Sequence, residues 1–203
     1  MSQTTFWDGV ARSYAARPVR DQAAYEATLT RVRSYLSATD RVLELGCGTG
    51  STALLLASSV ARYMATDISG EMIAIAREKG VPDNVTFTQA AIETAEAGEA
   101  VDVILAFNLL HLVNDIPRGL ADIARRLPQG GRFISKTPCL GYRRWLFAPL
   151  IGALRLIGKA PHVHLLTPDT LEQHLRDAGF KIIETGDYPA APPSRFIVAE
   201  KRG

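Results

Sequence analysis

The chain contains the stretch Val42-Leu43-Glu44-Leu45, followed at once by Gly46-Cys47-Gly48-Thr49-Gly50. The first part is short and mostly apolar, which is typical of a buried β-strand. The alternate glycines end that strand and let the chain turn tightly before a helix, because no Cβ restricts the backbone. The N–H groups that open such a helix can bind a carboxylate or phosphate. The stretch therefore predicts a ligand site at a strand-to-helix turn.

The spacing of these glycines separates the known kinds of glycine-rich turn. A dinucleotide fingerprint requires G-x-G-x-x-G, whereas here Gly50 falls one position early and Ser51 takes the third place. A phosphate-binding P-loop requires a lysine after the last glycine, and none follows Gly50. What stands instead is E-x-G-x-G-x-G. A nicotinamide-dependent oxidoreductase stays an alternative, which this spacing disfavours.

Strand and helix patterns alternate along the chain. We expect strands at 41–45, 63–67, 85–88, 101–107, 132–136, 180–184 and 196–201, and helices at 23–36, 51–59, 69–79, 120–127 and 167–177. This order predicts an α/β fold with an open, mostly parallel sheet and helices on both faces. The last two strands lie too close in sequence for a crossover helix, so we expect them to form a C-terminal antiparallel hairpin.

The turn at 44–50, with Asp67 closing the second strand, resembles the first motifs of the Rossmann-like (class I) S-adenosylmethionine-dependent methyltransferases. The likeness covers about residues 40–180 and is nearest to the small-molecule and quinone methyltransferases. It implies a three-layer, seven-stranded Rossmann-like sheet, with S-adenosylmethionine as cofactor and S-adenosylhomocysteine as product. It also implies that Asp67 binds both ribose hydroxyls, and a carboxylate can accept two hydrogen bonds from a diol.

The resemblance further assigns a set of cofactor-binding residues around the ends of the first four strands. In that family Glu44 helps to hold the turn and the methionine amino group, and an acid after the third strand often meets the adenine. Ala91 stands at that place here, so we expect backbone groups of Ala91 and Ile92 to contact the adenine instead. The expected cofactor residues are Glu44, Gly46, Cys47, Gly48, Gly50, Asp67, Ile68, Met72, Ala91, Ile92, Phe107 and Asn108.

Two side chains are candidates for catalysis. His111 matches a histidine of many small-molecule relatives and would orient or deprotonate the substrate, although a structural histidine is an equal alternative. Tyr14 lies in an aromatic N-terminal segment that either lines the pocket or packs a helix. Asn108 is followed by Leu109 and not by proline, which disfavours the motif of the enzymes that methylate amino groups of nucleic-acid bases.

We interpret the chain as a single methyltransferase domain over residues 1–203. Its expected parts are an N-terminal helical lid at 1–38, a cofactor-binding core at 39–137, a substrate-side insertion at 138–166, and a last helix with the terminal hairpin at 167–203. The apolar insertion forms a pocket wall, a homodimer contact or a membrane-surface helix, and Arg143, Arg144, Arg155 and Lys159 suit the last. Each interpretation favours a lipophilic or aromatic acceptor.

Composition supports this picture. The chain has 203 residues, 47% of them hydrophobic, and a net charge of +2, which predicts one globular domain and no nucleic-acid partner. Its two cysteines make no disulfide framework, and no signal peptide is visible, so we expect a cytoplasmic protein. His162 and His164 lack a third ligand, so we expect no metal site and treat this pair as incidental.

The function predicted from the sequence is methyl transfer from S-adenosylmethionine to a small, lipophilic or aromatic acceptor by in-line displacement. A methyltransferase acting on a lipid or a macromolecule is the main alternative. A cofactor-binding protein without catalysis is a further one, because intact glycines and Asp67 argue for binding alone.

Overall fold

The computed structural model describes residues 2–95 and 100–203. Its centre is a seven-stranded sheet in the order β3-β2-β1-β4-β5-β7-β6. The strands are β1 (Arg41–Leu45), β2 (Arg62–Asp67), β3 (Val85–Gln89), β4 (Val103–Phe107), β5 (Arg132–Pro138), β6 (Phe180–Asp187) and β7 (Ser194–Lys201). The strand order reverses between β1 and β4, which is where open α/β sheets bind their ligands.

The first five strands pair in parallel, and β7 runs antiparallel to both β5 and β6. The predicted Rossmann-like α/β sheet with a C-terminal hairpin is therefore confirmed. Only a short turn joins β6 to β7, so no crossover fits between them and β7 must reverse direction. A register shift between Ile182 and Glu184 marks a bulge in β6.

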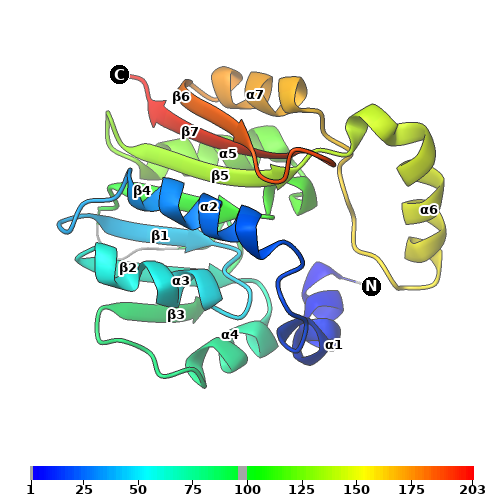
Figure 1. The fold of residues 1–203 in the computed structure, drawn as a ribbon, viewed down its shortest axis with the longest axis horizontal. Helices are drawn as coiled ribbons and strands as arrows, with labels where there is room; N and C mark the ends of the chain where they lie inside the picture. Colours follow the sequence, from blue (N-terminus) through cyan, green and yellow to red (C-terminus); the bar gives the residue numbers. More distant parts are fainter. Residues whose placement is uncertain (1, 96–99) are drawn as a thin grey trace.

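Helices cover both faces of the sheet (Figure 1). One buried cluster joins side chains of α2 (Gln22–Arg33), α3 (Ser51–Leu56) and α4 (Gly70–Arg77) to one face. The other cluster joins α5 (Ile116–Arg126) and α7 (Pro168–Asp177) to the opposite face. The three-layer arrangement thus follows from two apolar faces that need separate covers.

Several boundaries differ from the sequence-based prediction. Helix α5 begins at Ile116 instead of 120, because Asp115 caps the N–H of Arg118 at 3.0 Å and Pro117 fits the first turn. The segment expected as one helix at 51–59 splits into α3 and a 3-10 turn, η1 (Ala57–Ser59). Ser69 caps α4 as predicted and accepts a hydrogen bond from the Met72 N–H at 3.1 Å.

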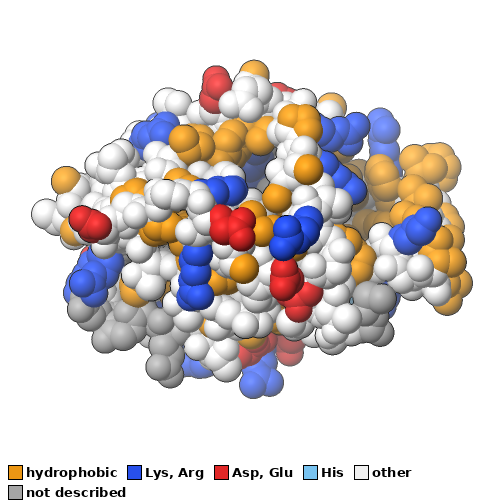
Figure 2. Space-filling model, turned by 90° about the horizontal axis from the view of Figure 1, so that it is seen from below, with side chains coloured by type: hydrophobic (Ala, Val, Ile, Leu, Met, Phe, Trp, Pro, Cys, Tyr) orange, Lys and Arg blue, Asp and Glu red, His pale blue; other side chains and the backbone are white. Residues whose placement is uncertain are grey.

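Two helices stand outside the layers, beyond the carboxyl ends of the parallel strands. Figure 1 shows α1 (Gln3–Ala15) and α6 (Arg144–Leu156) at this same end of the molecule. Helix α6 follows the 3-10 turn η3 (Gly141–Arg143), and hydrophobic side chains gather over its part of the surface (Figure 2). None of the described helices combines the length and the apolar character needed to cross a bilayer.

Candidate cofactor and acceptor site

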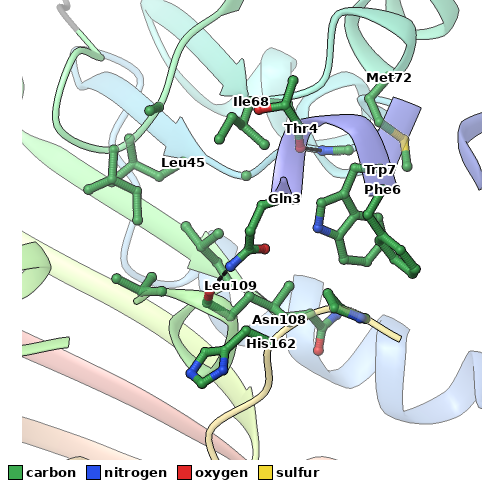
Figure 3. Close-up of a pocket in the computed structure, with 18 of the residues that line it drawn as sticks. Gln3, Thr4, Phe6, Trp7, Leu45, Ile68, Met72, Asn108, Leu109 and His162 are labelled. Carbon is green, nitrogen blue, oxygen red and sulfur yellow. Dashed lines mark hydrogen bonds between the residues drawn. The ribbon is translucent and has the colours of Figure 1, made fainter. Parts of the chain in front are cut away.

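A cavity of about 890 Å³ lies where the carboxyl ends of β1, β2 and β4 meet. Its walls come from four places in the chain: the strand ends, helix α1, the stretch after β3, and the last part of the insertion, near His162. Figure 3 shows Gln3 of α1 and His162 of the insertion reaching into the same space from different sides, with Phe6 and Trp7 along α1. The volume is large enough for a cofactor together with a small acceptor.

The glycine-rich turn presents bare backbone to this cavity. Gly48 has a φ of +53°, and a Cβ added to it would meet nothing closer than Tyr14 at 3.9 Å. Gly50 has a different task, because a Cβ there would lie 2.6 Å from the Phe87 ring and 2.9 Å from the Ala76 methyl. Gly48 thus leaves room for a ligand, whereas Gly50 lets the turn pack closely on β3 and α4.

Asp67 stands at the end of β2 and is held by the turn itself. Its carboxylate accepts hydrogen bonds from the Gly48 N–H at 2.8 Å and from the Ser69 N–H at 2.9 Å. Burial raises the pKa of Asp67, while these two N–H groups oppose that rise by favouring the charged form. Each carboxylate oxygen keeps a lone pair for another donor, so the group fits a ribose diol.

Nine of the twelve expected cofactor residues line the cavity. They are Gly46, Gly48, Asp67, Ile68, Met72, Ala91, Ile92, Phe107 and Asn108. The other three, Glu44, Cys47 and Gly50, do not line it.

Glu44 and Cys47 lie behind the turn, in the interior. The Tyr63 hydroxyl donates a hydrogen bond to the Glu44 carboxylate at 2.9 Å. Burial raises the pKa of Glu44 to about 7 and raises the pKa of the Cys47 thiol well above its usual range. A buried, protonated thiol is a poor nucleophile, so the geometry gives Cys47 a packing environment.

The stretch after β3 forms a separate wall. Ala90, Ala91, Ile92 and Glu93 all line the cavity there. The Ala91 N–H already donates to the Thr94 hydroxyl at 3.2 Å, and the Ala91 carbonyl accepts from the Ala95 N–H at 2.8 Å. A ligand edge at this wall would therefore have to share the polar groups of Ala91.

Asn108 turns the chain at the end of β4. It is the only described residue other than glycine with a positive φ, at 55°. Asparagine tolerates this left-handed conformation better than most residues, and such strain concentrates at binding sites. Its N–H donates to the Lys136 carbonyl at 2.7 Å, so β5 holds the turn in place. The turn brings Asn108 and Leu109 to the cavity wall.

Helix α1 covers the cavity as a roof, and contacts from its first turn and its middle hold it in place. The Gln3 side-chain amide donates to the Leu112 carbonyl at 2.5 Å, beyond β4. At the other side, the Asp8 carboxylate accepts from the Ser69 hydroxyl at 2.6 Å. No local sequence pattern points to Gln3 or Asp8, because both contacts join residues far apart in the chain.

The aromatic residues of α1 pack edge to face along this roof. The ring centres of Phe6 and Trp7 are 5.3 Å apart, and those of Trp7 and Tyr14 are 6.2 Å apart. All three side chains line the cavity. Burial and the nearby Asp67 raise the pKa of Tyr14, so its hydroxyl stays protonated and can donate a hydrogen bond.

The histidines occupy other positions than the sequence suggested. His162 lines the cavity and His111 does not. The Nε2 atoms of His162 and His164 lie 3.1 Å apart, and the His164 N–H donates to the His111 carbonyl at 2.7 Å. His111 therefore holds the returning insertion. Within residues 2–95 and 100–203, no group of three or more His, Cys, Asp and Glu is placed to hold a metal ion.

The imidazoles of His111 and His162 both have a lowered pKa. Burial lowers the pKa of His111 to about 4, with a further contribution from His164. The pKa of His162 is also lowered, by burial and by the nearby His164 and Arg155. A neutral imidazole in a cavity wall can accept a proton from a bound hydroxyl.

The fold and the site together define a class: a Rossmann-like domain with a glycine-rich turn and an acid at the end of β2. Comparison with known proteins agrees. Residues 17–185 match the model of a methyltransferase domain family. The chain belongs to this family, which confirms the recognition as a class I methyltransferase domain with S-adenosylmethionine as its cofactor.

Individual relatives extend this comparison. The chain is 30% identical over 183 residues to a demethylmenaquinone methyltransferase of Symbiobacterium thermophilum, covering 73% of this chain and 70% of that protein. It is 34% identical over 99 residues to an uncharacterized methyltransferase, YcgJ, of Bacillus subtilis. That match covers 46% of this chain and only 39% of YcgJ.

Solved structures show the same fold at low sequence identity. A chain of the Haloferax volcanii complex that contains the Trm112 methyltransferase activator superposes with a TM-score of 0.82 at 17% identity, covering 100% of this chain and 98% of that one. The magnesium protoporphyrin IX methyltransferase of Synechocystis with bound SAH gives 0.72 at 19% identity, covering 98% and 95%.

Proposed function

We propose that this protein transfers a methyl group to a small, lipophilic or aromatic acceptor that carries a hydroxyl group. The observation that carries the proposal is the mixed lining of one cavity. Polar groups, the Asp67 carboxylate and the bare backbone of Gly48, line it together with the apolar side chains of Trp7 and Leu109 and the imidazole of His162. The demethylmenaquinone methyltransferase among the relatives is named for an acceptor of this lipophilic, aromatic kind.

The polar groups of the cavity suit S-adenosylmethionine. Asp67 would hold the ribose hydroxyls, Gly46 and Gly48 would approach the ribose and methionine part, and Ala91 and Ile92 would border the adenine. When bound, the cofactor supplies an electrophilic methyl group on a sulfonium, which passes to the acceptor by in-line displacement. The chain's own contribution is to orient the acceptor and exclude water, which α1 does as a roof tied by Gln3 and Asp8.

His162 is the residue that we propose to accept the hydroxyl proton. As the acceptor oxygen forms its bond to the methyl carbon, its proton passes to the neutral imidazole of His162. His164, bonded to His162 at 3.1 Å, positions this ring. Tyr14 would donate a hydrogen bond to the acceptor, and His111 would act as a positioning residue through its carbonyl contact with His164.

A panel assay tests the proposal. Labelled S-adenosylmethionine is incubated with phenols and quinols and, in parallel, with sugars and nucleotides. We expect labelled product from the aromatic panel only. His162→Gln should lower turnover about 100-fold or more, as loss of a general base does, while leaving the affinity for S-adenosylmethionine unchanged. Preferred methylation of sugars or nucleotides, or full activity of His162→Gln, would contradict the proposal.

The pH profile adds an independent readout. Because His162 must be neutral to accept a proton, and because burial lowers its pKa, turnover should stay constant near neutral pH. It should fall only where the pH drops below the usual range of histidine. His162→Gln should lose this acid limb, whereas His111→Gln should keep it.

A further inference from the structure

Helix α6 carries a large apolar face that the protein does not cover. None of its residues is buried, although most of them are apolar. Trp145 is 78% exposed and Leu156 is 90% exposed. A helix of a globular protein normally turns its apolar side inward, so this outward face requires a partner.

The exposed side chains share one side of the helix. Residues three, four and seven positions apart lie on the same side, and the apolar residues of α6 follow this spacing. The inward side is formed by Phe147, Ile151 and Leu154, which are half-buried. The outward side comprises Trp145, Leu146, Pro149, Leu150, Ala153, Leu156 and Ile157. We call these seven residues the outer face of α6.

Charge around the outer face has one sign. Arg143 and Lys159 are exposed at the two ends of the helix, Arg144 and Arg155 are exposed on its inward side, and the sequence has no acidic residue from position 123 to 168. Figure 2 shows hydrophobic side chains gathered at the α6 end of the molecule, with Lys and Arg near them. Apolar residues bordered by cations are the composition of a helix that lies in the interface of an anionic membrane.

We propose that the outer face of α6 docks onto an anionic lipid surface. This inference goes beyond the proposed function, since it names a docking surface and not an acceptor. A second copy of the chain fits this surface less well. A two-fold contact would bring the cations of one copy near those of the other, and the segment has no acidic residue to balance them.

Helix α6 lies next to the cavity, so docking would affect how the cavity is placed relative to the lipid. Arg155, Gly158, Ala160, Pro161 and His162, at the end of α6 and just after it, line the cavity. A docked α6 would therefore hold the part of the cavity that His162 lines, where we propose that the acceptor binds, next to the lipid. This last step rests on the proposed function, whereas the docking itself does not.

Vesicle flotation of the full chain tests the docking without any turnover. We expect the protein to float with vesicles of phosphatidylcholine and phosphatidylglycerol, and to stay behind with phosphatidylcholine alone or at high salt. Trp145→Ser with Leu156→Ser should weaken binding at least tenfold, or about 1.4 kcal/mol. The matched control, Leu55→Ser with Ile183→Ser, removes two exposed apolar side chains from other surfaces and should bind as wild type.

Charge reversal provides the second pair of variants. Arg143→Glu with Lys159→Glu should lower binding to the anionic vesicles at least tenfold, whereas Arg118→Glu with Lys181→Glu, which changes the net charge equally elsewhere, should have little effect. Failure to float, or equal floating of all variants, would overturn the proposal. The proposal would also be overturned if the protein did not bind vesicles but sedimented as a dimer, and if Trp145→Ser with Leu156→Ser abolished that dimer. A chain that floats but methylates no aromatic acceptor would reject only the proposed function.

Discussion

Asp67 and Gly48 belong to a cavity wall whose supporting strands are buried on both sides, whereas α6, which leads into the wall formed by the insertion, has no buried residue. The first region is held by β1, β2 and β4 and by backbone hydrogen bonds. The second is attached through irregular segments. Main-chain bonds hold these segments, from the His164 N–H to the His111 carbonyl at 2.7 Å and from the Gly141 N–H to the Leu166 carbonyl at 2.8 Å.

This difference separates what the fold must keep from what it can vary. A change behind the glycine-rich turn disturbs the sheet itself, because the turn packs on β3 and α4. A substitution on α6 changes a side chain that faces solvent or the cavity wall. It can therefore alter the proposed acceptor specificity or the proposed docking surface with little effect on the free energy of unfolding.

The largest effect is expected for Gly50→Ala. The new Cβ would meet the Phe87 ring at 2.6 Å and would sit at a φ of +76°. Strain and overpacking together should lower the free energy of unfolding by about 3 kcal/mol or more, measured by urea denaturation. Gly80→Ala is the matched control, because its φ is also positive but no atom lies within 4 Å. It should lose only about 1 kcal/mol, and an equal loss in both variants would contradict the packing argument.

His111 lies at the boundary of the two regions and should make stability depend on pH. Its pKa is about 4 in the folded protein and about 6.5 in an unfolded chain, so between these values the unfolded state binds more protons. Stability should therefore fall as the pH drops from about 6.5 to about 4.5, by about 2 kcal/mol.

His111→Gln should remove this part of the pH dependence in urea denaturation at several pH values. Glu44, whose pKa burial raises to about 7, has the opposite effect, since its contribution is lost as the pH rises. Both proteins share Glu44, so the difference between them isolates His111. Parallel pH curves for the two proteins would disprove the assignment.

Asp67→Asn should weaken the binding of S-adenosylmethionine. The variant keeps the shape of the side chain but loses the charge that strengthens hydrogen bonds to a diol. We expect a dissociation constant raised at least tenfold, about 1.4 kcal/mol, in isothermal titration calorimetry. Asp102→Asn is the control: this carboxylate also accepts a backbone N–H, from Arg41 at 2.9 Å, but it precedes β4 and lies away from the cavity. Equal affinities in the two variants would speak against the cofactor role of Asp67.

The smallest effect is expected on α6. Leu150→Ala should change the free energy of unfolding by no more than about 0.5 kcal/mol, because Leu150 is exposed. The same substitution at Leu105, which is fully buried in β4, should cost about 2–5 kcal/mol. Thermal unfolding of both variants compares the regions directly. A similar loss at Leu150 would mean that α6 packs as part of the core.

Much of the fold was predictable because its signals are local. The glycine-rich turn, the Ser69 cap and the acid closing β2 each depend on a few neighbouring residues, so the sequence places them directly. Helix α5 was predicted to start too late because Asp115 and Pro117 form a start signal that precedes the apolar pattern. Nine of the twelve residues that the resemblance suggested for the cofactor line one cavity and three do not, and their role in binding stays a prediction.

The class of fold, the glycine-rich turn and the place of Asp67 could be read from the sequence alone, since strand ends and turn residues carry those features. The contacts of Gln3 and Asp8, the place of His162 in the cavity wall and the outward apolar face of α6 became visible only in three dimensions. These features join segments far apart in the chain. Their geometry depends on how the layers pack, which no local pattern encodes.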